Sequence, residues 1–158
     1  MLRVSNHQDS KFNGMKKRFI LSALLLIMSL GFCLGGNPYT TLYIYGGEDG
    51  DVYLGKLNAS RYDSESIWNE YGKYGNKYRS DCIWNEYGKY GSKYSRYSPF
   101  NEYASHPPVL KDKNGRFYGY FTANKYKSKR ANYDIVDTIC ENYEKIRDDL
   151  DDWYDVIF

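Results

Sequence analysis

Aromatic and basic side chains alternate at regular intervals through the middle of this sequence. Residues 67–75 read Ile-Trp-Asn-Glu-Tyr-Gly-Lys-Tyr-Gly, and the same nine residues recur at 83–91. Aromatic rings stack on the flat faces of sugars or bases, and nearby lysines pair with anionic groups. The candidate binding residues are the rings and lysines of the two copies, namely Trp68, Tyr71, Tyr74, Trp84, Tyr87, Tyr90, Lys73 and Lys89. The alternative is that the rings face inward as a core and the charges form a solvated surface.

Residues suited to acid–base or nucleophilic catalysis are scarce beyond residue 37. His106 is the one histidine in that part of the sequence, so a Ser-His-Asp or Cys-His arrangement would have to use it. It precedes two prolines and stands where the two copies have Tyr74 and Tyr90. A tyrosine-to-histidine change at the end of a repeat explains it more simply. The sequence therefore predicts a protein that is not an enzyme, and a hydrolase that uses His106 is the least favoured hypothesis.

Metal and nucleotide sites lack their usual residue spacing in this sequence. No cluster of histidines and cysteines has zinc-site spacing. The glycines of residues 46–50 are not followed by the Gly-Lys-Ser/Thr ending of a phosphate loop. Glu48, Asp49 and Asp51 do not match an EF-hand loop, so a solvated turn is the favoured interpretation. We expect no cofactor.

The N-terminal part has the layout of a secretory signal peptide. A basic cluster at residues 15–18 precedes an uncharged, apolar run at 19–34 and a turn-forming stretch at 35–38. The run is shorter than the roughly 20 residues that span a membrane. We expect residues 1–36 to be an N-terminal extension and signal peptide, with a retained inner-membrane anchor and then a buried core helix as alternatives. The chain would be exported to the periplasm, the cell surface or the medium, with residues 37–158 as one domain.

Three cysteines are present: Cys33, Cys82 and Cys140. Cys33 follows Leu-Gly-Phe, and the bulky Phe32 argues against lipid attachment there. An oxidising compartment would permit a bridge between Cys82 and Cys140, and a loop of that length stabilises by about 4 kcal/mol in the chain-entropy model. The alternative is two unpaired, buried thiols, and the sequence favours neither. Met15 would also serve as a start, which would make the first residues an upstream extension.

Charge is strongly segregated along the sequence. Residues 56–130 contain 15 basic and 7 acidic side chains, whereas residues 131–158 contain 2 basic and 9 acidic ones. The simplest use of this asymmetry is internal, with an acidic helix docked on a basic body. A basic face that attracts anionic polymers is the alternative.

The central part is a tandem repeat of 16 residues. Trp68, Trp84 and Phe100 stand 16 residues apart, and a degraded third copy ends at residue 107. Because one such unit cannot bury its own rings, we expect the copies at 60–107 to stack these rings into an aromatic ladder. Within each unit we expect one helical turn, capped by Ser66 or Asp81 and ended by a left-handed Gly72 or Gly88, followed by extended chain.

Strands and a helix are predicted on both sides of the repeats. Runs of β-forming residues at 41–45 and 51–54 indicate a hairpin. The Asn-Gly pair at 114–115 indicates a second hairpin over 109–122. Apolar residues in steps of three and four predict an amphipathic helix over 131–157. The predicted fold class is α+β, with short tyrosine-rich 16-residue repeats flanked by β-hairpins and a C-terminal amphipathic helix.

Several motifs resemble a family of uncharacterised exported bacterial proteins with tandem Ser-Ile-Trp-Asn-x-Tyr-Gly-x-Tyr-Gly-Ser-Lys-Tyr-Ser repeats. They are the repeat itself, Tyr-Ser-Pro-Phe-Asn at 97–101, Pro-Pro-Val at 107–109 and Asn-Gly-Arg-Phe-Tyr-Gly-Tyr-Phe at 114–121. The resemblance covers about residues 43–126. Members of that family often have Leu-Gly-Cys-x-x-Cys before the repeats, whereas residues 54–59 here read Leu-Gly-Lys-Leu-Asn-Ala. The resemblance implies bacterial export. Because both cysteines of that motif are absent here, any metal or disulfide role that they have in the family is not available to this chain.

These patterns together predict a non-enzymatic envelope or extracellular module that binds cell-wall glycan. The alternative is an accessory protein that binds another exported protein through its acidic C-terminal helix. Export places cell-envelope polysaccharide within reach, so a nucleic-acid partner is not expected. Contact with a membrane is expected only through the N-terminal segment.

Overall fold

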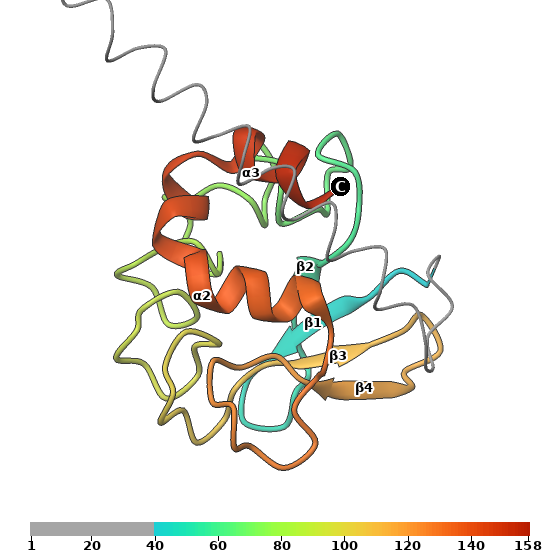
Figure 1. Cartoon of the computed structure of the whole chain (residues 1–158), viewed down its shortest axis with the longest axis vertical. Helices are drawn as coiled ribbons and strands as arrows, with labels where there is room; N and C mark the ends of the chain where they lie inside the picture. The colour runs from blue at the N-terminus through green and yellow to red at the C-terminus, as the bar shows by residue number, and fades with distance from the viewer. Residues whose placement is uncertain (1–39) are drawn as a thin grey trace, which may run out of the picture. The chain divides into compact units, whose positions relative to one another are not determined.

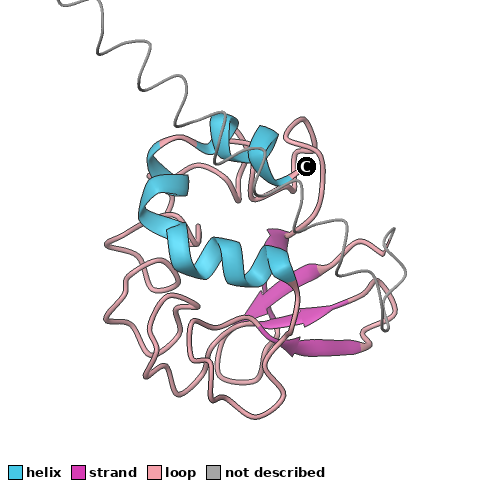
Figure 2. Ribbon diagram, viewed as in Figure 1, coloured by secondary structure: helices cyan, strands magenta, loops and turns pink. Residues whose placement is uncertain are grey.

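The computed structural model describes residues 40–158 (Figure 1). The predicted signal peptide or anchor, residues 1–36, and Cys33 lie outside the described residues. Two strands come first, then a long segment of turns, two more strands and two helices (Figure 2). The α+β class is confirmed. The strands are β1 (Tyr43–Gly46), β2 (Val52–Lys56), β3 (Val109–Lys111) and β4 (Phe117–Tyr120), and the helices are α2 (Asp134–Asp148) and α3 (Leu150–Ile157).

The two hairpins join into one antiparallel sheet with the order β2-β1-β3-β4. β1 is central, because Tyr45 pairs with Tyr53 of β2 on one side and with Val109 of β3 on the other. Ile44 and Leu110 stand opposite each other and are fully buried. Alternation along these strands therefore gives the sheet one apolar face toward the core. The joining of the hairpins was not predicted from the sequence.

Residues 57–108 form consecutive turns in place of the predicted helical turns. In each of the three turn segments, 60–75, 76–91 and 92–107, every third backbone N–H donates to the carbonyl oxygen three residues earlier. The accepting residues are Ser60, Asp63, Ser66 and Asn69, then Asn76, Arg79, Cys82 and Asn85, then Ser92, Ser95, Ser98 and Asn101. Serine and asparagine side chains at these corners bond to the local backbone, which favours turns over helix. Figure 2 shows this part as a series of loops beside the helices.

The predicted cap and glycine roles in these segments are wrong. The hydroxyl of Ser66 accepts a hydrogen bond from the backbone N–H of Trp68 at 3.1 Å and caps no helix. Gly72 and Gly88 are not among the glycines with positive φ in the described chain. They are packed closely instead, since a Cβ on Gly88 would lie 3.0 Å from the carbonyl oxygen of Ser80.

A column of aromatic rings runs through the turn segments. The centroids of Trp68 and Trp84 are 5.9 Å apart, and those of Trp84 and Phe100 are also 5.9 Å apart. Tyr143 of α2 stacks on Phe100 at 4.4 Å, and Tyr154 of α3 contacts Trp68 at 6.0 Å. Both tryptophans are buried. The helices therefore close the column at both ends and complete the core.

The same connection between a hairpin and the turns that follow it occurs twice, which was not predicted from the sequence. Each hairpin is joined to the turns after it by two backbone hydrogen bonds. In the first, Lys56 N donates to Glu65 O and Ile67 N donates to Lys56 O. In the second, Tyr120 N donates to Lys129 O and Ala131 N donates to Tyr120 O. The two sets are 64 residues apart, which is four times the 16-residue interval. Gly55 and Gly119 occupy the same place in β2 and β4 with φ of 110° and 123°. Few identical residues mark this correspondence, so the hydrogen bonds reveal it where the sequence does not.

Two helices replace the single helix predicted over 131–157. α2 begins at Asp134 and ends at Asp148, and Asp149 breaks the helix with φ −149° and ψ 79°. The side chain of Asp149 accepts a hydrogen bond from Asp152 N and so caps α3. Aspartate is a poor interior residue and a good N-cap, which explains the break. The apolar stripe continues across it, so the periodicity alone predicted one helix.

Candidate functional site

Seven tyrosines project into solvent, each from the same kind of turn. They are Tyr62, Tyr71, Tyr78, Tyr87, Tyr94, Tyr103 and Tyr126, and their exposed fractions run from 82% to 98%. The backbone N–H of each donates to the side-chain oxygen of the asparagine or serine two residues earlier, at 2.9–3.3 Å. These bonds fix the backbone on both sides of the ring. We call these residues the exposed tyrosines.

The residue before each exposed tyrosine divides the set into two kinds. A basic residue precedes four of them, as in Lys77-Tyr78, and a glutamate precedes three, as in Glu86-Tyr87. A hydrogen bond to Glu86 raises the pKa of the Tyr87 phenol, and Glu70 does the same for Tyr71. Each turn segment therefore presents one tyrosine beside a cation and one beside an anion.

The candidate binding residues from the sequence divide between core and surface. The rings of Trp68, Tyr74, Trp84 and Tyr90 are buried, so they offer no face to a ligand in this structure. Tyr71, Tyr87, Lys73 and Lys89 are exposed. Five of the exposed tyrosines were absent from the candidate set. An asparagine or serine stands two residues before each of them, but a serine also stands two residues before the half-buried Tyr97 and the buried Trp68, so this pattern alone does not identify the exposed rings.

The buried tyrosines of the repeats pack against the sheet. A Cβ on Gly55 of β2 would lie 2.7 Å from the Cβ of Tyr74, and one on Gly46 of β1 would lie 2.6 Å from the ring of Tyr90. Lys73 and Lys89 place their ammonium groups over the Tyr74 and Tyr90 rings, at 5.0 Å and 5.4 Å from the centroids. These two lysines therefore cover structural rings and also remain accessible.

The acidic helices dock on the basic turn segments through ion pairs. Arg61 contacts the carboxylates of Asp151 and Asp155 of α3. A second contact has the charges reversed, because the helix supplies the cation: Arg147 of α2 pairs with Glu86 of the second turn segment at 3.0 Å. Exposed pairs of this kind contribute little stability individually. They show where the segregated charges of the sequence meet within the chain.

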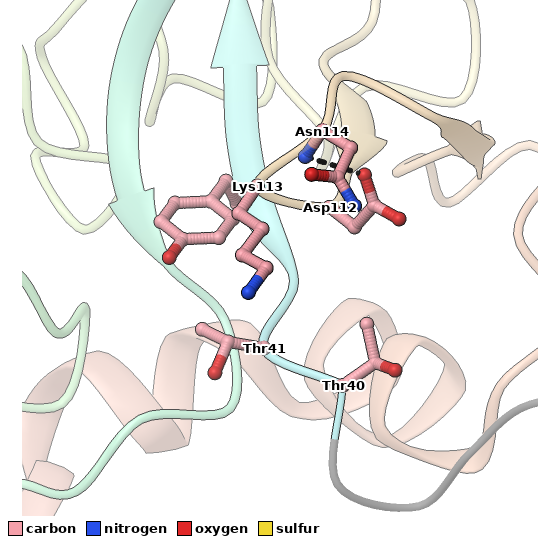
Figure 3. A pocket seen from close by; sticks show the side chains of 6 residues that line it. Thr40, Thr41, Asp112, Lys113 and Asn114 are labelled. Atoms are coloured by element: carbon pink, nitrogen blue, oxygen red, sulfur yellow. Dashed lines mark hydrogen bonds between the residues drawn. The ribbon is translucent and has the colours of Figure 1, made fainter.

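The surface of the described residues has hollows, and two of them bear on the site. The first has a volume of about 310 Å³, and Figure 3 shows Thr40, Thr41 and Lys113 around it. Asp112 also lines it, but its Oδ1 accepts hydrogen bonds from the backbone N–H groups of Asn114 and Arg116 at 2.8 Å and 3.0 Å. That carboxylate therefore holds the turn between β3 and β4. The second hollow, about 430 Å³, lies over Trp84 between Tyr78, Tyr87 and the end of α2.

His106 lies in a small polar cluster on the surface. Its Nδ1 is 2.8 Å from the hydroxyl of Ser105 and 3.2 Å from a guanidinium nitrogen of Arg96, and its Nε2 is 3.6 Å from Glu48. A general base must be free to take the hydroxyl proton. Here the Arg96 donor shares the same nitrogen, so the contacts hold the imidazole in place without isolating a Ser–His pair.

The two described cysteines are free thiols. Cys82 and Cys140 are both buried, and the bridge weighed from the sequence is not formed. Burial raises the pKa of each thiol to about 12. A thiol that stays protonated is a poor nucleophile and a poor metal ligand. Both cysteines therefore serve as small core residues in this structure.

Residues 40–158 show neither a metal-binding cluster nor a membrane-spanning helix. Within that range no group of three His, Cys, Asp or Glu side chains is placed to hold a metal ion. No helix there is long and apolar enough to cross a membrane. The alternative of an anchor concerns residues that the structure does not describe.

No protein-family model, no curated protein and no solved structure matches this chain. The resemblance to exported bacterial repeat proteins therefore stays a prediction from the sequence motifs.

Proposed function

We propose that the chain is an exported, non-enzymatic module of the bacterial cell envelope that binds cell-wall glycan through tyrosines displayed by 16-residue repeats. The observation that carries this proposal is the set of exposed tyrosines on hydrogen-bonded turns. Export rests on the signal-peptide layout and on the resemblance to exported bacterial proteins.

The exposed tyrosines have no role in the core that would explain their positions. A ring that stays more than four-fifths exposed contributes little to burial, yet the same ring recurs in every turn segment. Tyrosine offers a large, rigid, amphipathic surface that loses little side-chain entropy on binding, which is why it is enriched at recognition surfaces. Rings held at regular intervals suit a partner that is itself a repeating polymer.

The alternative partner, another exported protein bound by the acidic helix, has less support. The helices direct Tyr143 and Tyr154 onto the aromatic column. Several of their carboxylates pair with basic residues of the turn segments. A partner would have to use the outer side of α2 and α3, where Val156 is exposed.

The binding proposal is tested by sedimentation with purified peptidoglycan. Protein produced from the full chain should sediment with the polymer, and changing Tyr62, Tyr71, Tyr78, Tyr87, Tyr94 and Tyr103 to alanine should abolish this. The same six changed to phenylalanine form the matched control, which keeps the rings and should still sediment. Wild-type protein that stays in the supernatant would reject glycan binding.

Export is tested separately by intact-mass analysis of the protein from fractionated cells. We expect a mass that corresponds to cleavage near residue 36, in an envelope or secreted fraction. Full-length protein in the cytosolic fraction would contradict export.

A further inference from the structure

We propose that the groove over Trp84 is a dedicated subsite for an uncharged sugar chain of two or more rings. This inference rests on the proposed glycan binding and adds the place and the charge class of the ligand. The groove lies where α2 ends, between the two exposed tyrosines of the second turn segment.

The helices cover the aromatic column unevenly. Tyr154 and Phe158 lie against Trp68, with centroids at 6.0 Å and 5.9 Å, and Tyr143 stacks on Phe100. The ring contacts of Trp84 are its two neighbours in the column. At this level the helix contributes Arg147 and Asp148, and a hollow of about 430 Å³ remains above the column. That volume lies within the range of about 300–1,000 Å³ that small-molecule sites occupy.

Two aromatic walls face this groove. Tyr78 and Tyr87 line it and are 85% and 90% exposed, so their ring faces are free for a ligand. Both backbones are held by the bonds from Tyr78 N to Asn76 Oδ1 at 2.9 Å and from Tyr87 N to Asn85 Oδ1 at 3.0 Å. Stiff backbones of this kind lower the entropy cost of ordering the site when a ligand binds.

The charges that line the groove are balanced. Lys77 and Arg147 contribute two positive charges, and Glu86 and Asp148 contribute two negative ones. Arg147 pairs with Glu86 at 3.0 Å and with Asp148 at 3.3 Å. A polyanion would find no net attraction here, whereas a ligand with many hydroxyl groups finds both donors and acceptors. The lining therefore favours an uncharged saccharide over an acidic polymer.

The corresponding places in the other two segments are occupied by helix side chains. Arg61, which precedes Tyr62, contacts two aspartates of α3 and stacks on Tyr154 at 4.5 Å. Lys93, which precedes Tyr94, lies 3.6 Å from Glu144 of α2. In the second segment a groove remains between the two exposed tyrosines.

The test is isothermal titration calorimetry of the full-chain protein with the tetramer of N-acetylglucosamine. Changing Tyr78 and Tyr87 together to alanine should weaken binding at least about tenfold, the usual effect of truncating an aromatic anchor. The matched control is Tyr126→Ala, because Tyr126 is exposed on the same kind of turn but lies outside the three turn segments, and it should keep wild-type affinity. All three side chains are exposed, so both variants should fold, which circular dichroism would check.

The outcomes separate this inference from the proposed function. Equal weakening in the double variant and in Tyr126→Ala would overturn the dedicated groove while leaving glycan binding intact. Wild-type protein that sediments with peptidoglycan but does not bind the tetramer would also overturn it. Tighter binding of oligogalacturonate than of the tetramer would overturn the assignment to an uncharged ligand. Failure to sediment with peptidoglycan while the tetramer still binds counts against the proposed function and not against the groove.

Discussion

The indole nitrogen of Trp84 donates a hydrogen bond of 2.6 Å to the carbonyl oxygen of Ile67 in the preceding turn segment. The indole of Trp68 does the same one level earlier, donating to the carbonyl oxygen of Leu57 at 2.7 Å. Neighbouring levels of the column are therefore joined by polar bonds as well as by ring contacts. Phe100 has no such donor, and the column ends there against Phe121 and Tyr143.

Replacing Trp84 by phenylalanine should lower the free energy of unfolding by about 3 kcal/mol. The change removes buried volume and leaves the carbonyl oxygen of Ile67 without its indole donor. Urea denaturation followed by circular dichroism would measure the loss. Trp153→Phe is the matched control, because Trp153 is half-buried on α3, and it should cost less than about 1 kcal/mol. Equal losses in the two variants would show that neither the burial of Trp84 nor its hydrogen bond to Ile67 adds to the free energy of unfolding beyond what a half-buried tryptophan contributes.

Gly91 and Gly88 should respond differently to alanine. A Cβ on Gly91 would lie 2.1 Å from the carbonyl oxygen of Asn85, and backbone atoms there cannot move aside. We expect Gly91→Ala to destabilise by more than about 3 kcal/mol. The third segment has Ala104 where the second has Gly88, so Gly88→Ala should change stability by less than about 1 kcal/mol. Urea midpoints of the two variants would check this, and a tolerated Gly91→Ala would contradict the close approach.

The sequence predicted the elements whose cues are local and left out those that depend on tertiary contacts. Apolar alternation and turn residues were enough for the hairpins, and the 3.6-residue period was enough for a C-terminal helix. The pairing of β1 with β3 depends on residues more than 60 positions apart, such as Tyr45 and Val109, and no local pattern records it. The break at Asp149 was missed because the apolar stripe continues through it.

The candidate site was only half recognised for a similar reason. Tyr71 and Tyr74 look alike in the sequence, since each is followed directly by glycine. Tyr71 follows an asparagine that bonds its backbone and points outward, whereas Tyr74 packs against Gly55 of the sheet. Which of the two faces solvent depends on a hairpin elsewhere in the chain. The groove over Trp84 also depends on where α2 ends, which the periodicity did not show.

Cys82→Ser should be tolerated, because serine already occupies the same position in the other two segments, as Ser66 and Ser98. The Cys82 sulfur accepts from Trp84 N at 3.4 Å and donates to the carbonyl oxygen of Tyr74 at 2.9 Å. The hydroxyl of Ser66 likewise accepts from Trp68 N, and it donates to the carbonyl oxygen of Ala59. We expect a change of less than about 1 kcal/mol for Cys82→Ser and a loss of about 2 kcal/mol for Cys82→Val, which leaves Trp84 N unpaired. Equal losses by urea denaturation would refute the hydrogen-bonding role.

Stability should fall above about pH 9 because two buried thiols resist ionisation. The pKa of Cys82 and of Cys140 is raised by burial from 9.0 to about 12 in the folded chain. Below pH 9 both states keep these protons, so the two groups leave stability unchanged. Between pH 9 and 12 the unfolded chain binds fewer protons than the folded one, so the free energy of unfolding decreases as pH rises.

In that window each thiol should lower the free energy of unfolding by roughly 1 kcal/mol per pH unit. This is close to the largest change that one titrating proton can produce, about 1.4 kcal/mol per pH unit. Urea denaturation at pH 8, 9.5 and 10.5 would measure the slope. Cys82→Ser removes one of the two thiols, so its stability should decline less steeply than that of the wild type, by roughly 1 kcal/mol per pH unit. Partly buried tyrosines such as Tyr143, whose pKa burial raises to about 12, titrate in both proteins and cancel when one slope is subtracted from the other. Identical slopes would mean that the Cys82 thiol ionises as readily in the folded chain as in the unfolded one, and that it is not enclosed as this structure shows.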